Sequence, residues 1–164
     1  KHFGRLWDPK DVDFTAFSPN SEETIEHVRR ALASRPRLMV IHLVGIDRAG
    51  HQYGWGSDEY DKAVTRVDAQ VGSIVDILRE QGLLKDSLLV VVSDHGGAGR
   101  GHGGDSDMER QTPAILYGRT VKPEAMMDRP ISSRDIARTI HSVLRLPTVG
   151  ILEGQPLSEL FFVE

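Results

Sequence analysis

Five residues with metal-binding side chains stand in three short motifs of this 164-residue sequence. The first motif carries Asp47 and His51, the second carries Asp94 and His95, and the third carries His102. The chain contains no cysteine, so this set offers only imidazole nitrogen and carboxylate oxygen. Such a set suits a divalent transition metal, with zinc and manganese as the leading candidates. The residue types therefore predict a metal site.

The spacing within the motifs indicates how many ions to expect. Asp47 and His51 lie four residues apart in a predicted loop, where both side chains can reach the same ion. Asp94 and His95 are adjacent, and adjacent side chains on an extended backbone point in opposite directions. We therefore expect them to splay towards two ions, an arrangement that clamps the attacking and leaving oxygens during displacement at phosphorus. A two-metal site of this kind suits displacement at phosphorus.

Apolar runs predict the strands that must position these motifs. Residues 38–44 and 88–92 are almost continuously apolar, which is typical of strands buried on both faces. Residues 113–117 predict a shorter third strand. The first two motifs directly follow the first two strands, and ligands of open α/β sheets bind beyond the carboxyl ends of the strands. We therefore expect the motif residues to converge at one edge of the sheet.

Helical periodicity and capping residues predict three helices around these strands. The combination indicates an α/β fold with a largely parallel sheet and helices on both faces. Residues 1–19 show no sustained period and are expected to be irregular. No linker divides residues 1–164, which we expect to form a single unit. The predicted helices begin at Asn20 or Ser21, at Ser57 and at Ser132, and they end before Pro36, at Gly82 and before Pro147.

The composition excludes several classes of protein. Hydrophobic residues make up 39% and charged residues 27% of the chain, which excludes collagen-like, coiled-coil and disordered proteins. The formal net charge of −4 provides no basic field, so we expect no nucleic acid binding. The apolar runs are too short to cross a bilayer, so we expect no transmembrane segment in this chain. Six of the sixteen glycines fall between Gly96 and Gly104, and we interpret them as the framework of a ligand loop rather than a mobile surface loop.

The motifs read Gly-Ile-Asp-x-x-Gly-His at 45–51, Ser-Asp-His-Gly at 93–96, Gly-His-Gly at 101–103 and Gln-Thr-Pro at 111–113. In this order they resemble the alkaline phosphatase superfamily. The similarity is greatest to its type I phosphodiesterase and nucleotide pyrophosphatase branch, and to the ethanolamine-phosphate transferases of lipid-anchor synthesis. Residues 133–157 resemble the end of the same domain, so the resemblance covers roughly residues 37–160. It implies an alkaline-phosphatase-like α/β fold.

The resemblance implies two divalent metal ions, with zinc favoured and manganese as the alternative. Asp47, His51 and His102 would hold one ion, and Asp94 and His95 would be ligands of the second. The spacing between His95 and His102 varies among family members and is short in this chain.

The resemblance also implies a further Asp ligand and a Ser or Thr nucleophile, and no segment before residue 37 matches either. The sequence begins at Lys1 rather than at Met. We interpret the chain as the C-terminal half of an alkaline-phosphatase-like catalytic domain whose missing partner is the N-terminal half. In the intact domain, the nucleophile would form a covalent phospho-enzyme that water or an acceptor alcohol then resolves. We therefore expect the chain alone to bind metal but to turn over its substrate, a small phosphoester or phospholipid-type molecule, poorly.

Four further residues are candidates for substrate binding. Arg48 and Arg100 lie within the predicted ligand segments, and a guanidinium group pairs bidentately with phosphate oxygens. Tyr53 and Trp55 follow His51 and are candidates to line a substrate pocket. The competing interpretations are surface charge for the arginines and packing against the loop for the aromatic residues.

The sequence leaves other functions open. A phosphoglycerate-mutase-like or sulfatase-like member of the same superfamily is one alternative, and a non-catalytic metal-binding domain is another. Sulfatases usually carry Asp-Asn where this chain has Asp94 and His95. The sequence does not distinguish a phosphatase from a phosphodiesterase or a transferase. Many members of the superfamily act outside the cytoplasm or at membranes, so an extracytoplasmic or membrane-associated parent protein is favoured.

Overall fold

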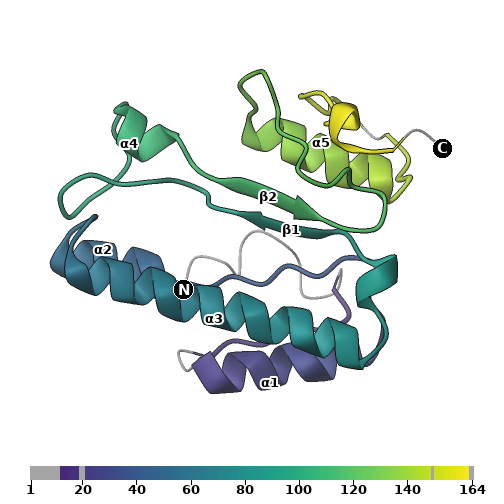
Figure 1. Ribbon diagram of the computed structural model, residues 1–164, viewed down its shortest axis with the longest axis horizontal. Helices are drawn as coiled ribbons and strands as arrows, with labels where there is room; N and C mark the ends of the chain where they lie inside the picture. Colours follow the sequence, from purple (N-terminus) through teal and green to yellow (C-terminus); the bar gives the residue numbers. More distant parts are fainter. Residues whose placement is uncertain (1–11, 19–20, 149, 163–164) are drawn as a thin grey trace. The chain divides into compact units, whose positions relative to one another are not determined.

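The computed structural model describes residues 12–18, 21–148 and 150–162, and the chain divides into two compact units, Lys1–Leu83 and Leu84–Glu164. Residues 12–18 form neither helix nor strand, and the rest of the segment expected to be irregular lies outside the described residues. Among the described residues, no helix has both the length and the apolar character needed to cross a membrane. The first unit contains the helices α1 (Ser21–Leu32), α2 (Gly45–Tyr53) and α3 (Asp58–Glu80) (Figure 1). The second unit contains, in chain order, the short 3-10 helix η3 (Leu84–Asp86), β1 (Leu89–Val92), α4 (Asp107–Arg110), β2 (Ala114–Tyr117), α5 (Ser133–Val143) and a second 3-10 helix, η4 (Ser158–Leu160).

Helices α1 and α3 of the first unit pack against each other through their apolar stripes. Val28 and Ala31 of α1 and Ile74 and Ile77 of α3 are buried. These residues recur three residues apart, which places each pair on one side of its helix. The helix expected before Pro36 is therefore confirmed, and its buried side is the one that the periodicity predicts.

Helix α3 begins and ends at the residues that the sequence indicates. The Ser57 hydroxyl accepts a hydrogen bond from the Tyr60 N–H at 3.2 Å, which caps the N-terminus. Gly82 has a φ of +67°, and the next residue, Leu83, donates its N–H to the Leu78 carbonyl at 2.8 Å. This backbone pairing is the Schellman motif, in which a glycine adopts the left-handed conformation just past the helix.

The strand predicted over residues 38–44 is not formed. The structure has no strand hydrogen bonding in this segment, and the side chains of Leu38 and Val40 are 56% and 74% exposed. An apolar run favours a strand only where neighbouring strands supply hydrogen bonds and both faces are covered. Among the described residues nothing fulfils both conditions for this segment, so the expectation from hydrophobicity was wrong here.

The other two predicted strands are formed, but they pair in the opposite sense to that expected. Strands β1 and β2 are antiparallel, with Leu89 opposite Tyr117 and Val92 opposite Ala114 (Figure 1). A parallel pair needs a crossover, usually a helix, whereas residues 93–113 contain only the four-residue helix α4. The chain therefore returns as a long hairpin. In the described residues the sheet has two strands rather than a largely parallel array, and the structure is mixed α/β.

Burial in the hairpin also differs from the expectation. Along β2, Ile115 and Tyr117 are exposed while Ala114 and Leu116 are half-buried. This alternation is typical of an antiparallel strand with one face covered. Burial on both faces was predicted for residues 88–92, and this prediction is not met either, because β1 is only half-buried along Leu89–Val91 and Val92 is exposed.

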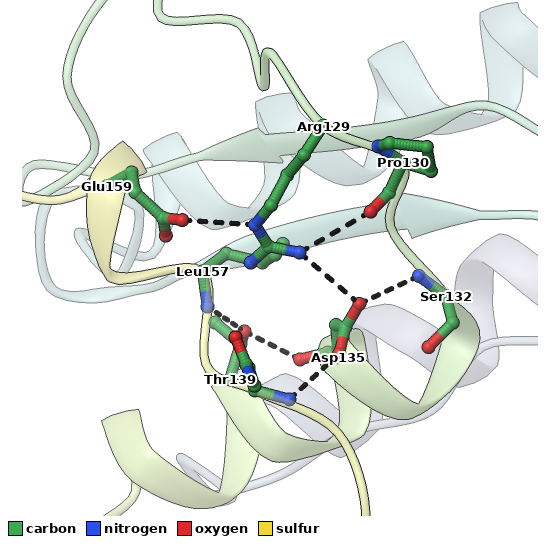
Figure 2. A network of polar contacts seen from close by, with 8 residues as sticks. Arg129, Pro130, Ser132, Asp135, Thr139, Leu157 and Glu159 are labelled. Atoms are coloured by element: carbon green, nitrogen blue, oxygen red, sulfur yellow. Dashed lines mark hydrogen bonds and ion pairs between the residues drawn. The ribbon is translucent and has the colours of Figure 1, made fainter.

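Asp135, in the first turn of α5, fastens the C-terminal segment of the second unit to that helix (Figure 2). Its Oδ2 accepts a hydrogen bond from the Ser132 N–H at 2.9 Å, and its Oδ1 accepts one from the Gln155 N–H at 2.8 Å. The first bond belongs to the capping box predicted from the sequence. The Arg129 guanidinium lies 3.7 Å from Oδ2 and donates to Glu159 at 3.2 Å. These contacts lower the pKa of Asp135, with the hydrogen bond from Gln155 as the largest cause.

Thr139 joins the same two segments one turn further along α5 (Figure 2). Its Oγ1 donates to the Asp135 carbonyl at 2.7 Å and accepts a hydrogen bond from the Leu157 N–H at 2.9 Å. Thr139 is 2% exposed and Leu157 is completely buried. A buried N–H group requires a partner, and the Thr139 hydroxyl provides it.

Candidate metal-binding site

Asp47 and His51 lie on helix α2 rather than in the loop that the sequence suggested. Residues four apart on a helix face the same side, and Asp47 Oδ1 is 3.5 Å from His51 Nε2. Gly50 lies within α2 although glycine destabilises a helix interior. The helix keeps both side chains on one face more firmly than a loop would.

The separation of the Asp47 and His51 ligand atoms suits a shared ion. Ligands at about 2.0–2.1 Å from a tetrahedral zinc ion lie about 3.3 Å from each other. The observed 3.5 Å is close to this value without any rearrangement of α2. Both side chains are roughly half-exposed, although the Asp47 Oδ1 atom itself is buried. The pair fits the predicted chemistry.

Trp55 packs against the same face of α2. Its ring lies edge-on to His51, with centroids 5.3 Å apart and an interplanar angle of 86°. A Cβ at Gly50 would lie 2.7 Å from the Trp55 ring, so the glycine is required for this approach. Trp55 thus packs on the helix, as the competing interpretation had it. Tyr53 ends α2 and is exposed, as is Arg48.

Asp94 and His95 follow β1, as predicted, but they do not point apart. Asp94 Oδ2 lies 3.8 Å from His95 Nε2. The prediction of splayed side chains assumed an extended backbone, whereas β1 ends at Val92 and the chain bends at Asp94. Bending brings the carboxylate and the imidazole to the same side. The Ser93 hydroxyl donates to the His95 carbonyl at 2.7 Å within this bend.

The structure stacks the imidazole of His102 on that of His95. Their ring centroids are 3.6 Å apart and their planes differ by 16°. Asp94, His95 and His102 therefore form one cluster within the second unit. Between the two histidines, Ala98 and Gly101 exchange backbone hydrogen bonds of 3.0 and 3.1 Å, which makes a tight turn with Arg100 exposed inside it.

The glycine-rich segment is held in place by the backbone of α4. Gly96 donates its N–H to the Glu109 carbonyl at 2.7 Å, and Gly97 donates to the Met108 carbonyl at 3.0 Å. The Glu109 carboxylate accepts a hydrogen bond from the Gly104 N–H at 2.8 Å. Glu109 lies outside the predicted metal-binding motifs, although a Ser106-x-x-Glu109 capping box is readable in the sequence. The glycines therefore frame a loop of defined path.

The geometry and the motifs agree with the comparison to known families. A sequence model of the family described as type I phosphodiesterase / nucleotide pyrophosphatase matches residues 5–100. This match covers more than half of the chain, and the chain therefore belongs to the type I phosphodiesterase / nucleotide pyrophosphatase family, within the alkaline phosphatase superfamily. The family indicated by the motifs is confirmed, although the matched residues begin before residue 37 and end before His102.

Individual relatives fall in the two branches that the motifs indicate. The catalytic subunit of GPI ethanolamine phosphate transferase 3 from Homo sapiens is 32% identical over 73% of this chain and 10% of its own length. GPI ethanolamine phosphate transferase 2 from Aspergillus fumigatus is 29% identical over 88% of this chain and 19% of its own length. Human ectonucleotide pyrophosphatase/phosphodiesterase family member 1 is 42% identical over 38% of this chain and 7% of its own length. The chain thus spans less than a fifth of each of these curated relatives.

Proposed function

We propose that this chain is part of a metal-dependent phosphoester hydrolase or phosphotransferase with a two-metal site. The observation that carries the proposal is the cluster of Asp94, His95 and His102 at the end of β1, in a member of a phosphodiesterase family. Imidazole and carboxylate donors without any thiolate suit zinc best and manganese next. Such ions, when bound, supply Lewis-acid stabilisation of the negative charge on phosphoryl oxygens.

We assign Asp47, His51 and His102 to one ion and Asp94 and His95 to the second. The 3.5 Å separation of the Asp47 and His51 ligand atoms supports the first group. Asp94 Oδ2 lies 3.8 Å from His95 Nε2, which supports the second group, and His102 stacks on His95 beside it. Each stacked ring would then serve a different ion.

The substrate in this proposal is a small phosphoester or a phospholipid-type molecule. Arg48 and Arg100 are exposed in the ligand segments, where their guanidinium groups would pair with phosphate oxygens, and Tyr53 would border the same substrate. The names of the relatives, GPI ethanolamine phosphate transferases and an ectonucleotide pyrophosphatase/phosphodiesterase, support this class. They also support a parent protein that is extracytoplasmic or membrane-associated. We assign the Ser or Thr nucleophile to no residue of this chain.

Elemental analysis of the purified chain after incubation with zinc or manganese tests the proposal. We expect bound metal in the wild type, and less metal in His51→Ala and in His102→Ala. His141→Ala is the matched control, because His141 lies in α5 and its ring contacts the Pro147 carbonyl instead of any predicted ligand. Absence of metal from the wild type after supplementation would contradict the proposal.

Hydrolysis of p-nitrophenyl phosphate and of bis(p-nitrophenyl) phosphate tests where the nucleophile lies. We expect the chain alone to hydrolyse both poorly, even when it is loaded with metal. Rapid, chelator-sensitive turnover by the pure chain would mean that a nucleophile lies within it.

A further inference from the structure

Glu109 contacts the metal-ligand loop through both its side chain and its main chain. Its Oε1 accepts a hydrogen bond from the Gly104 N–H at 2.8 Å. Its Oε2 accepts hydrogen bonds from the Ser106 hydroxyl at 2.5 Å and from the Ser106 N–H at 3.3 Å. Its carbonyl accepts the Gly96 N–H at 2.7 Å. Four donors thus converge on one residue.

Two of these donors are close in sequence to the stacked histidines. Gly96 directly follows His95, and Gly104 is two residues beyond His102. The loop between these two glycines begins directly after His95 and carries His102. A residue that holds Gly96 and Gly104 at once therefore fixes the two ends of this segment relative to each other.

Gly96 permits a backbone approach that a residue with a Cβ would prevent, and Gly104 leaves room for the Glu109 carboxylate. A Cβ at Gly96 would lie 2.0 Å from the Met108 carbonyl oxygen, and one at Gly104 would lie 2.5 Å from the Glu109 carboxylate. The absence of a side chain at Gly96 and Gly104 therefore allows the loop to lie close to Met108 and Glu109. This accounts for two glycines of the cluster that the metal ligands alone leave unexplained.

Both carboxylate oxygens of Glu109 are engaged by donors of the loop. The Ser106 hydroxyl, followed by the Gly104 N–H, lowers the pKa of Glu109, so the group is an ionised acceptor near neutral pH. An ionised carboxylate accepts hydrogen bonds and donates none, which matches a site with only donors around it. Its role is therefore to hold the loop.

We propose that Glu109 is a positioning residue that holds the Gly96–Gly104 loop so that His95 and His102 are presented, already stacked, to the metal ions. This inference rests on the proposed function for the identity of the ions. The loop geometry itself, which is independent of any ion, rests on the hydrogen bonds of Glu109. Substitution of a residue that orients metal ligands without binding the metal itself typically lowers metal affinity by about 10- to 100-fold.

Glu109→Gln tests the proposal in the full chain, because a glutamine amide presents an NH₂ group to at least one donor of the loop. Asp105→Asn is the matched control. Asp105 directly follows that loop, its side chain is 98% exposed, and it forms an ion pair of 3.5 Å with Arg110. Ser106→Ala is a second, milder variant that removes one hydroxyl donor. Far-UV circular dichroism verifies that each variant is folded.

Two readouts separate positioning from other roles. In the metal-free chain, proton NMR contacts between the His95 and His102 rings should weaken in Glu109→Gln and persist in Asp105→Asn. In a zinc titration by calorimetry, Glu109→Gln should lower the affinity about tenfold with the number of bound ions unchanged. Ser106→Ala should shift both readouts in the same direction by less.

The outcomes distinguish the two proposals. Unchanged ring contacts in folded Glu109→Gln would overturn the positioning role, and so would loss of one bound ion, which would make Glu109 a metal ligand. If the wild type binds no zinc, the proposed function fails. The ring contacts in the metal-free variants then decide the positioning role by themselves.

Discussion

Replacing Thr139 by valine removes one hydroxyl group while preserving the shape of a buried side chain. That hydroxyl is the acceptor for the Leu157 N–H at 2.9 Å, and it donates to the Asp135 carbonyl at 2.7 Å. Because Thr139 is 2% exposed and Leu157 is completely buried, no water can replace the lost acceptor without a local opening. The variant therefore leaves a buried N–H group without its partner.

The expected loss of stability follows from the free-energy cost of a buried N–H group that has no acceptor. A buried donor without an acceptor costs about 1–3 kcal/mol. The loss of the donor to the Asp135 carbonyl adds little, because that carbonyl belongs to a helix. We therefore expect Thr139→Val to lower the free energy of unfolding of the second unit by about 1–3 kcal/mol. Each 1.4 kcal/mol corresponds to about a tenfold faster exchange of amides that open with this unit.

Native-state hydrogen exchange of the Leu157 amide, together with urea unfolding, measures this effect. Thr65→Val is the matched control, since Thr65 also donates to a carbonyl four residues earlier, that of Asp61 at 3.0 Å, but on the exposed surface of α3. We expect the control to change stability by less than about 0.5 kcal/mol. Equal effects of the two substitutions would refute the claim that Thr139 fastens the C-terminal segment.

Two further predictions concern the same unit. The pKa values of Asp135 and Glu159 are lowered in the folded chain, chiefly by the Gln155 N–H and by the Glu159 backbone N–H, respectively. Both carboxylates therefore stabilise the fold above their unfolded pKa values of about 3.9 and 4.3, and this stability is lost as the pH falls through the lower folded values. Urea midpoints measured from pH 7 to pH 2 should decline in this acid range, and Asp135→Asn should flatten the decline; an equally steep decline in the variant would exclude Asp135 as a cause. Gly154→Ala should destabilise more than Gly150→Ala, because both glycines have positive φ but only at Gly154 would a Cβ meet backbone, at 2.6 Å. Thermal unfolding compares the two variants, and equal melting temperatures would argue against the close contact.

The helices are the part of the fold that the sequence predicts best. Helices α1, α3 and α5 follow from local signals: an apolar stripe, the Ser57 and Ser132 caps, and Gly82. Such signals act between residues that are near in sequence, so they are readable without knowledge of the rest of the fold. Helix α2 is the exception, because the need for Gly50 arises from a contact with Trp55 that is visible only in the structure.

Strand pairing is less predictable because it depends on distant partners. The apolar runs locate β1 and β2, but the sense of their pairing is determined by what connects them. Residues 93–113 contain no crossover helix, only α4. For residues 38–44, hydrophobicity records the tendency to be buried but not the presence of a hydrogen-bonded neighbour.

Part of the candidate site was predictable from local sequence spacing. The proximity of Asp47 to His51 follows from a spacing of four residues, although the helix that produces it was not expected. The stacking of His95 on His102 depends on the path of a glycine-rich loop, which no periodicity encodes. Glu109 fixes that path, and its capping-box signature is the one sequence signal that pointed to it.

The central claim is that this chain supplies ligands to two divalent ions in a phosphoester site. A crystal structure of the zinc-loaded chain, with anomalous scattering recorded at the zinc edge, tests it most directly. We predict two anomalous peaks about 3.5–4 Å apart, one bound by Asp47, His51 and His102 and the other by Asp94 and His95. Absence of peaks at these residues, or a zinc ion bound by other side chains, would contradict the account.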